Sequence, residues 1–313
     1  MATHGTELQR ETAKRAFWQN FETQPDVMGG STFETTSNSD QETYPYLSAA
    51  PSPIVMEGSR KHKDVPEISY TITNVKREST VNISYEMMKN NKLNQIAALS
   101  SELGVKAQQN KQEILADLLN NGHTATGPDD QFFFDTDHSD PGADFTTGQD
   151  NDLTQVIADV NIGVVTDAEW ATMIRSMRDA FLGFLDGQGD PVAPSPDTVF
   201  ELHVPAGYVS IAKRIEIVDQ LAGPVGNDLK GLYRTIFNPW LTANTATVGQ
   251  FFMVNPSGVR KPLIYQTNES TSFETGIGTD FEKETKDSWI GSFSYGNGGY
   301  GDWRYAVRMG TTT

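Results

Sequence analysis

The longest regular pattern of apolar positions runs from residue 92 to residue 120. Leucine, isoleucine and alanine recur there at steps of three, four or seven residues, which is the spacing of one face of an α-helix. The positions are Leu93, Ile96, Leu99, Leu103, Ala107, Ile114 and Leu118. A helix over 92–120 would be about 43 Å long at a rise of 1.5 Å per residue. The narrow stripe predicts a spine helix laid across a sheet.

Alternation of apolar and polar residues before this helix predicts a long β-hairpin over 44–84. Residues 68–75 and 81–85 alternate with the period of a strand. Residues 44–47 and 51–55, on the other side of the hairpin, are also expected to be extended, because residues before proline avoid the helical region. The tip over 57–64 is polar and basic, and few stretches are fully apolar. We therefore expect the hairpin to project from the body of the protein.

A second helix is predicted from residue 166. Thr166 can cap the helix and Glu169, three residues on, completes a capping box. Its buried face is marked by Trp170, Ile174, Met177, Phe181 and Leu185. Beyond it, the pattern predicts a strand at 199–204 and a short helix after Pro205 that ends near residue 217. Further strands are expected at 232–241, 250–254, 262–267, 288–295 and 303–309, which together indicate a mixed α+β fold.

The first 43 residues are polar and carry few apolar side chains. Phe17, Trp18, Phe21 and Phe33 are the aromatic exceptions. Alone, such a segment cannot bury enough area to offset the entropy lost on ordering. We expect either a disordered tail or an arm that orders on a neighbouring subunit.

The charge of the chain narrows the function classes. It has 24 Lys and Arg against 41 Asp and Glu, a formal net charge of −17. A surface this acidic repels phosphate backbones and argues against a general nucleic-acid binder. There is no cysteine, which excludes thiol nucleophiles and cysteine-based zinc sites. No apolar run has the length of a membrane span, and residues 1–16 lack the apolar region of a secretory signal, so cytoplasmic synthesis is expected.

An acidic loop over 123–152 is the first candidate for chemistry. It contains eight Asp and no Lys or Arg. Residues 135–146 resemble a calcium loop at the start but have Asp140 where glycine is required and Thr146 where glutamate is required. A weak cation site and a simply solvated loop both remain open. A metal-dependent hydrolase using Asp135, Asp137 and His138 is a minor alternative.

Two other patterns are weaker indications of a functional site. The glycine-rich stretch 296–301 matches G-x-G-x-x-G, but a strand-like segment follows it instead of a helix, so a glycine turn between two strands is expected in place of a nucleotide site. None of the five histidines has a partner four residues away, so a helical zinc pair is absent.

One dense basic cluster stands out against the acidic background. Arg60, Lys61 and Lys63 lie at the predicted hairpin tip. They could contact phosphate, contact the acidic surface of a neighbouring copy, or remain solvated. Charge complementarity favours the contact between subunits. With Phe17 and Trp18 of the arm, these residues are our candidate assembly contacts.

The order of these elements and several short phrases resemble the major capsid proteins of tailed phages with the Hong Kong 97-type fold. The chain looks closest to the Mu-like major head subunit family. The phrases are VNISYEMM at 81–88, GQGDPVAP at 187–194, FELHVP at 200–205, PWL at 239–241, RKPLIY at 260–265 and GYGDW at 299–303. The match covers most of residues 40–309.

The resemblance implies a division of the chain into four parts. Residues 1–43 would be the N-terminal arm and 44–84 the extended loop that overlaps the next subunit. Residues 85–152 with 275–313 would form the peripheral domain with its spine helix, and 153–274 the axial domain.

The resemblance also implies a function. The protein would be a non-enzymatic virion component that self-assembles as pentamers and hexamers into an icosahedral shell around double-stranded DNA. It would need no cofactor or metal and would not bind a membrane. A separate scaffold protein and a portal are implied partners, and DNA would be held by enclosure. A protein-filled nanocompartment of the same fold and a tail or connector protein are the alternatives within structural proteins.

Overall fold

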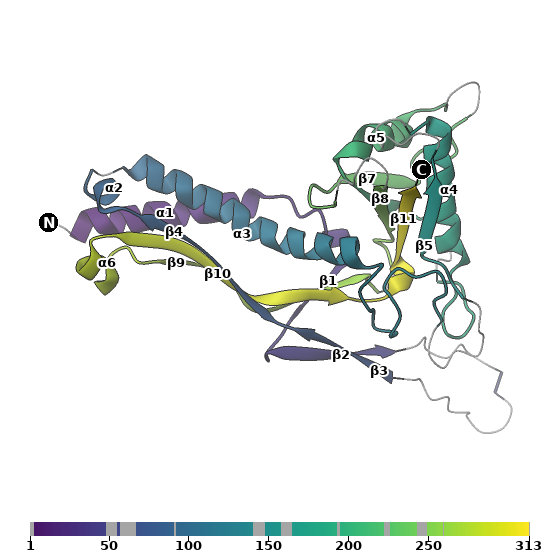
Figure 1. Cartoon of the computed structure of the whole chain (residues 1–313), viewed down its shortest axis with the longest axis horizontal. Coiled ribbons are helices and arrows are strands. Elements are labelled where there is room, and N and C mark those ends of the chain that lie inside the picture. Colours follow the sequence, from purple (N-terminus) through teal and green to yellow (C-terminus); the bar gives the residue numbers. More distant parts are fainter. Residues whose placement is uncertain are drawn as a thin grey trace.

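The computed structural model describes residues 3–47, 55–56, 67–90, 92–139, 148–157, 165–192, 195–221, 226–242, 249–258 and 260–312. They form an elongated unit and a compact unit, with a paired hairpin beside them (Figure 1). The N-terminal end lies at the far tip of the elongated unit and the C-terminal end lies in the compact unit. Helices and strands are mixed in both units, which confirms the predicted α+β class.

The elongated unit is built on a four-stranded sheet in the order β1-β9-β10-β4. Its strands are β1 (Thr32–Thr36), β9 (Leu263–Thr275), β10 (Ser288–Tyr300) and β4 (Val75–Ile83). β1 runs parallel to β9, whereas β10 is antiparallel to both of its neighbours. The short helices α2 (Tyr85–Lys89) and α6 (Asp280–Thr285) lie at the far tip (Figure 1).

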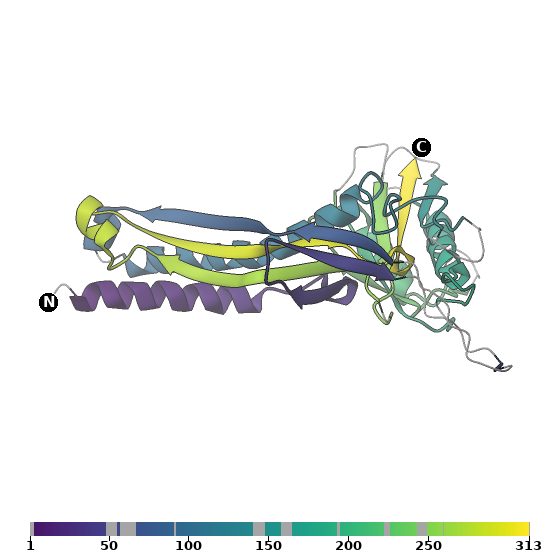
Figure 2. The same cartoon turned by 90° about the horizontal axis from the view of Figure 1, so that it is seen from below.

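Two long helices lie against one face of this sheet (Figure 2). They are α1 (Thr3–Thr23) and α3 (Leu93–Asn121), and α3 confirms the predicted spine helix almost to the residue. Its stripe residues Ile96 and Leu103 are buried in one cluster with Ile83 and Ile290 of the sheet. The narrow apolar face is therefore satisfied by one sheet and one neighbouring helix.

The first 43 residues fold back on their own chain, which corrects the expectation of a disordered tail or of an arm ordered only by a neighbour. Ala13 and Phe17, four residues apart on α1, are fully buried against α3 and the sheet. The two helices approach closely at Gly104, where an added Cβ would lie 2.3 Å from the carbonyl oxygen of Phe17. The partner of the polar segment was thus 87 residues further along the chain, beyond the reach of a local pattern.

The predicted hairpin is confirmed in its base. β2 (Gln41–Leu47) and β3 (Glu67–Thr73) pair antiparallel, with Tyr44 opposite Tyr70. The second part of the predicted hairpin, β4, joins the long sheet instead. The predicted tip with Arg60, Lys61 and Lys63 lies outside the described residues.

The compact unit contains a five-stranded sheet in the order β5-β11-β8-β6-β7. Its strands are β5 (Asp152–Val156), β11 (Ala306–Thr312), β8 (Gly249–Val254), β6 (Phe200–Val204) and β7 (Tyr233–Phe237). The helices are α4 (Asp167–Gly183) and α5 (Val209–Ile217), with 3₁₀ turns at Ala206–Tyr208 and Trp303–Tyr305. The predicted capping box of α4 is present: Thr166 Oγ1 accepts from Glu169 N, and the Glu169 carboxylate accepts from Thr166 N at 2.8 Å.

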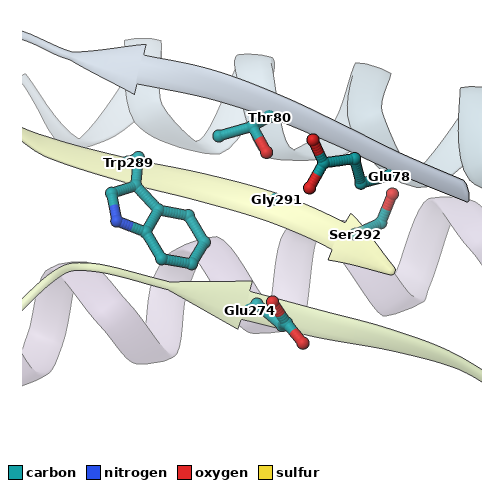
Figure 3. A pocket seen from close by; sticks show the side chains of 6 residues that line it. All are labelled: Glu78, Thr80, Glu274, Trp289, Gly291 and Ser292. Carbon is teal, nitrogen blue, oxygen red and sulfur yellow. The ribbon is translucent and has the colours of Figure 1, made fainter. Parts of the chain in front are cut away.

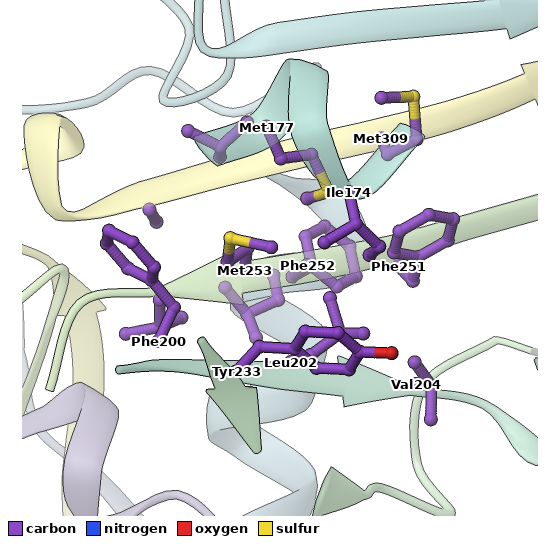
Figure 4. Close-up of a cluster of buried hydrophobic side chains, with 14 of the residues drawn as sticks. Ile174, Met177, Phe200, Leu202, Val204, Tyr233, Phe251, Phe252, Met253 and Met309 are labelled. Carbon is purple, nitrogen blue, oxygen red and sulfur yellow. The ribbon is translucent and has the colours of Figure 1, made fainter. Parts of the chain in front are cut away.

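The core of the molecule lies on both faces of this sheet (Figure 4). On one face, Trp170 of α4 stacks on Phe251 with ring centroids 4.7 Å apart. On the other face, Phe134 of the acidic loop stacks on Phe252 at 5.4 Å. Because both faces are covered, every residue of β8 is buried, which explains its unbroken apolar run.

The glycine-rich stretch 296–301 is not the predicted turn. Residues 296–300 continue β10, and their glycines lie where other elements pass close by. A Cβ on Gly298 would lie 2.9 Å from Leu118 of α3, and one on Gly299 would lie 2.4 Å from Ile72 of β3. Glycine therefore serves here to admit a helix and a hairpin against a strand, instead of freeing the backbone for a turn.

Two strands pair across the predicted domain boundaries, and the division into domains itself stays a prediction. All of β9 except its last residue falls within residues 153–274, yet β9 is a central strand of the long sheet. β11 falls within residues 275–313, yet it is a central strand of the compact sheet. The chain therefore crosses between the units more often than the sequence suggested.

Candidate assembly surfaces

The aromatic cluster of α1 contains two of the predicted assembly contacts. Phe17 is completely buried, 5.3 Å from Phe273 of β9 between ring centroids. Trp18 packs edge-on against Phe17 at 5.1 Å and against Phe21 at 5.3 Å, and it is only partly buried. Phe17 thus holds α1 to its own subunit. Trp18 is the one of the two with ring surface left for a neighbour, and this contact stays a prediction.

The base of the hairpin is fixed to the long sheet by a buried pair of amides. Gln266 of β9 donates from Nε2 to the carbonyl of Ile72 at 3.0 Å and to Asn74 Oδ1 at 2.8 Å. Its own Oε1 accepts from the hydroxyl of Tyr44 at 2.8 Å. Asn74 in turn donates to Ser37 Oγ at 2.8 Å. These bonds set the direction in which β2 and β3 leave the body.

A hollow of about 210 Å³ lies on the outer face of the long sheet, opposite the helices (Figure 3). Its lining is Glu78, Thr80, Glu274, Trp289, Gly291 and Ser292. Thr80 and Glu274 stand opposite Gly291 on either side, so the missing side chain of this glycine opens the hollow. Two carboxylates beside an indole ring suit a cationic side chain.

The acidic loop does not assemble the hydrolase set considered above. His138 is fully buried, with its Nδ1 2.8 Å from the equally buried Asp129 carboxylate. Its ring stacks on Trp303 at 4.0 Å. Asp137, in contrast, is exposed at the surface. The histidine therefore fastens the loop to the core, and no group of three or more metal-ligating side chains occurs in the part of the chain that the structure describes.

No motif in the sequence marks the joint between the two units. Met28 lies in the hydrophobic cluster that the two units share, and Ser31 Oγ is 3.1 Å from His203 Nε2 of β6. Lys111 of α3 bridges Asp26 at 3.3 Å and Glu34 at 2.5 Å. Burial alone would lower the pKa of Lys111, but these two carboxylates outweigh burial and raise this pKa. The alternation in β6 was the available signal, since it places Glu201 and His203 on the face away from the apolar residues.

Comparison with known families supports the resemblance found in the sequence. Residues 7–161, about half of the chain, match the family described as the Mu-like prophage major head subunit gpT. Among curated proteins, none matches the chain significantly.

Solved structures of viral shells share the fold. A chain of the procapsid of bacteriophage JBD30 is 19% identical, with a TM-score of 0.55 over 98% of this chain and 74% of that one. A chain of the JBD30 capsid decorated with minor capsid protein trimers is 21% identical, with a TM-score of 0.57 over 70% and 92%. A virus-like particle from Pyrococcus furiosus is 9% identical, with a TM-score of 0.54 over 96% and 98%.

The fold and the family match together define a major capsid protein of tailed phages, a structural component of the virion. Within this class the chain is similar to the Mu-like major head subunits over residues 7–161, and the resemblance seen in its sequence is confirmed. No helix in the described part of the chain is both long and apolar enough to cross a membrane.

Proposed function

We propose that this protein assembles as pentamers and hexamers into an icosahedral shell that encloses double-stranded DNA. The observation that carries the proposal is the shape of the subunit together with its fold. A long, thin unit with one open sheet face, and the β2–β3 pair beside it, leaves a large surface for a single chain, and neighbouring copies would cover it (Figure 1).

The two units correspond to the two roles expected of a capsid subunit. The elongated unit, with α3 as its spine, would be the peripheral domain. The compact unit would be the axial domain that meets its copies around the five-fold and six-fold axes. In this proposal β9 belongs to the peripheral domain and β11 to the axial domain, because that is where their sheets lie.

The net charge of the chain indicates how the shell would hold its contents. The net charge of −17 suits a shell whose contents must move freely, because acidic walls repel a phosphate backbone. DNA would therefore be enclosed and not bound at a specific site. We infer a separate scaffold protein and a portal as further partners, and synthesis in the cytoplasm of the bacterial host.

The decisive experiment is electron microscopy and mass measurement on the purified full-length chain. Closed shells tens of nanometres wide, or isolated pentamers and hexamers that await a scaffold, are the expected results. A chain that stays monomeric at high concentration, and under crowding, would overturn the proposal.

The similarity to the Pyrococcus furiosus virus-like particle favours one second candidate, a shell loaded with protein in place of DNA. The same purified particles distinguish the two. A protein co-purifying inside shells from the native source would favour the compartment. Nuclease-protected DNA in those shells would favour the phage head.

A further inference from the structure

A short strap of chain, residues 26–31, links the two units. It lies between α1 and β1, both of which belong to the elongated unit. At its start, Gln112 of α3 donates to Asp26 Oδ1 at 2.8 Å and accepts from Val27 N at 3.2 Å. Further on, the Met28 side chain lies in the hydrophobic cluster that the two units share, where Asn238 Nδ2 of the compact unit donates to its sulfur at 3.2 Å. The strap therefore leaves the elongated unit, fastens the compact unit and returns.

The last fastening of the strap is the contact between Ser31 and His203. β6 alternates strictly, so Phe200, Leu202 and Val204 point into the apolar core (Figure 4). Glu201 and His203 point to the opposite face, toward the strap. His203 is 0% exposed, and its Nε2 lies 3.1 Å from Ser31 Oγ. Next to it, the Glu201 carboxylate is packed so close to Gly30 that a Cβ there would lie 2.1 Å from its Oε2.

The surroundings of the ring fix where its proton sits. His203 Nδ1 is buried with no hydrogen-bond partner among the described residues. A proton on Nδ1 would leave a buried donor unsatisfied, which is costly. The neutral ring therefore carries its proton on Nε2 and donates to Ser31 Oγ. A second proton would have to occupy the unpartnered Nδ1, and the charged ring could be solvated only if the strap lifted away from it.

We propose that His203 is an acid-sensitive latch, which in its neutral form holds the strap on the compact unit and in its protonated form releases it. The charged groups around the ring come from three elements. Arg234 of β7 opposes a positive charge on His203. Glu201 of β6 lies 3.9 Å from Nε2 and is itself held by Arg234 at 3.1 Å, and Lys261 before β9 also acts on Glu201. The strap contributes only the neutral Ser31, because Asp26 faces Lys111 and Gln112.

The direction of the effect follows from the titration. Burial, with a smaller contribution from Arg234, lowers the pKa of His203 from 6.5 to about 4. A histidine with a lowered pKa in the folded state favours that state fully above pH 6.5, and the advantage is lost as the pH falls toward 4. Burial raises the pKa of Glu201, so this carboxyl needs its own control. The interval from 6.5 to about 4 allows the opening equilibrium of the strap to rise by at most about 300-fold.

The test is hydrogen–deuterium exchange of the full-length chain between pH 7.5 and 4.5, corrected for the intrinsic pH dependence of exchange. Amides over 27–36 should open progressively below pH 6.5, while α4 serves as an internal reference. His203→Gln should abolish this pH dependence, because a glutamine amide can still donate to Ser31 but does not titrate. Glu201→Gln should leave it in place.

Each other outcome counts against the latch. Equal pH dependence in His203→Gln and the unmodified chain would assign the effect elsewhere, and its loss in Glu201→Gln would assign it to the carboxyl. If His203→Gln does not fold, the titration of His203 in the unmodified chain, followed by NMR, tests the proposal instead. A His203 titration midpoint at or above 6.5 would overturn the proposal, whether or not the chain forms shells.

Discussion

Among single residues, Gly104 has the clearest structural requirement. The carbonyl of Phe17 occupies the space that a side chain at position 104 would need, and backbone cannot move aside as a flexible side chain can. We expect Gly104→Ala to lower the free energy of unfolding by about 1–3 kcal/mol, the usual cost of overpacking. Part of the loss would be offset by the better helix propensity of alanine, about 1 kcal/mol. Denaturant unfolding followed by circular dichroism measures the difference.

Gly183 provides the matched control. It also lies in a helix, the end of α4, but a Cβ there would meet nothing within 4 Å. Gly183→Ala should therefore be neutral or slightly stabilising. Equal unfolding free energies for the two variants would show that α1 and α3 do not approach as closely as described.

At the scale of a whole helix, the capped start of α4 leads to a prediction about stability. Thr166 and Glu169 cap each other's backbone N–H groups at this end. Thr166→Ala should destabilise the compact unit by about 1 kcal/mol, the typical loss for an N-cap. Thr172→Ala, in the same helix, should cost nothing comparable, because Thr172 only bonds back to the Ala168 carbonyl. A loss as large for Thr172 as for Thr166 would contradict the capping role; thermal unfolding of both variants decides.

The elements predicted correctly from sequence are those whose signals are local. α3 and α4 show helical periodicity with a cap or stop, and β6 has a turn before it and a proline after it. The errors came from partners distant in sequence. Nothing within residues 1–43 indicates that Phe17 meets Gly104, and nothing within 296–301 indicates that α3 and β3 pass over those glycines.

The candidate site was predicted less well than the fold, for a related reason. A surface contact between subunits requires knowing which side chains the subunit itself buries. Phe17 was selected as an aromatic in a polar segment, yet its own chain buries it completely. Conversely, the contact that holds the strap joins Ser31 and His203, which are 172 positions apart in the sequence. No motif marks such a pair.

At the scale of the whole molecule, the distribution of charge leads to a prediction about assembly. The chain carries a net charge of −17, and Arg60, Lys61 and Lys63 are its one dense basic cluster. Two neighbouring copies of so acidic a protein repel each other unless opposite charges meet locally. The outer hollow with Glu78 and Glu274 shows that the elongated unit offers carboxylates on an open face. A basic tip placed against such a face would offset part of the repulsion.

Replacing both Lys61 and Lys63 with glutamate should therefore block or strongly slow shell formation while leaving the subunit folded. Sedimentation and electron microscopy report assembly, and circular dichroism reports the fold. The variant Lys61→Arg with Lys63→Arg is the control, because it keeps both charges and should assemble normally. Raising the salt concentration from 50 mM to 500 mM should shrink the difference in assembly between the glutamate variant and the unmodified chain, since exposed charges are screened over shorter distances. Normal shells from the glutamate variant would show that the tip is merely solvated and that other surfaces hold the subunits together.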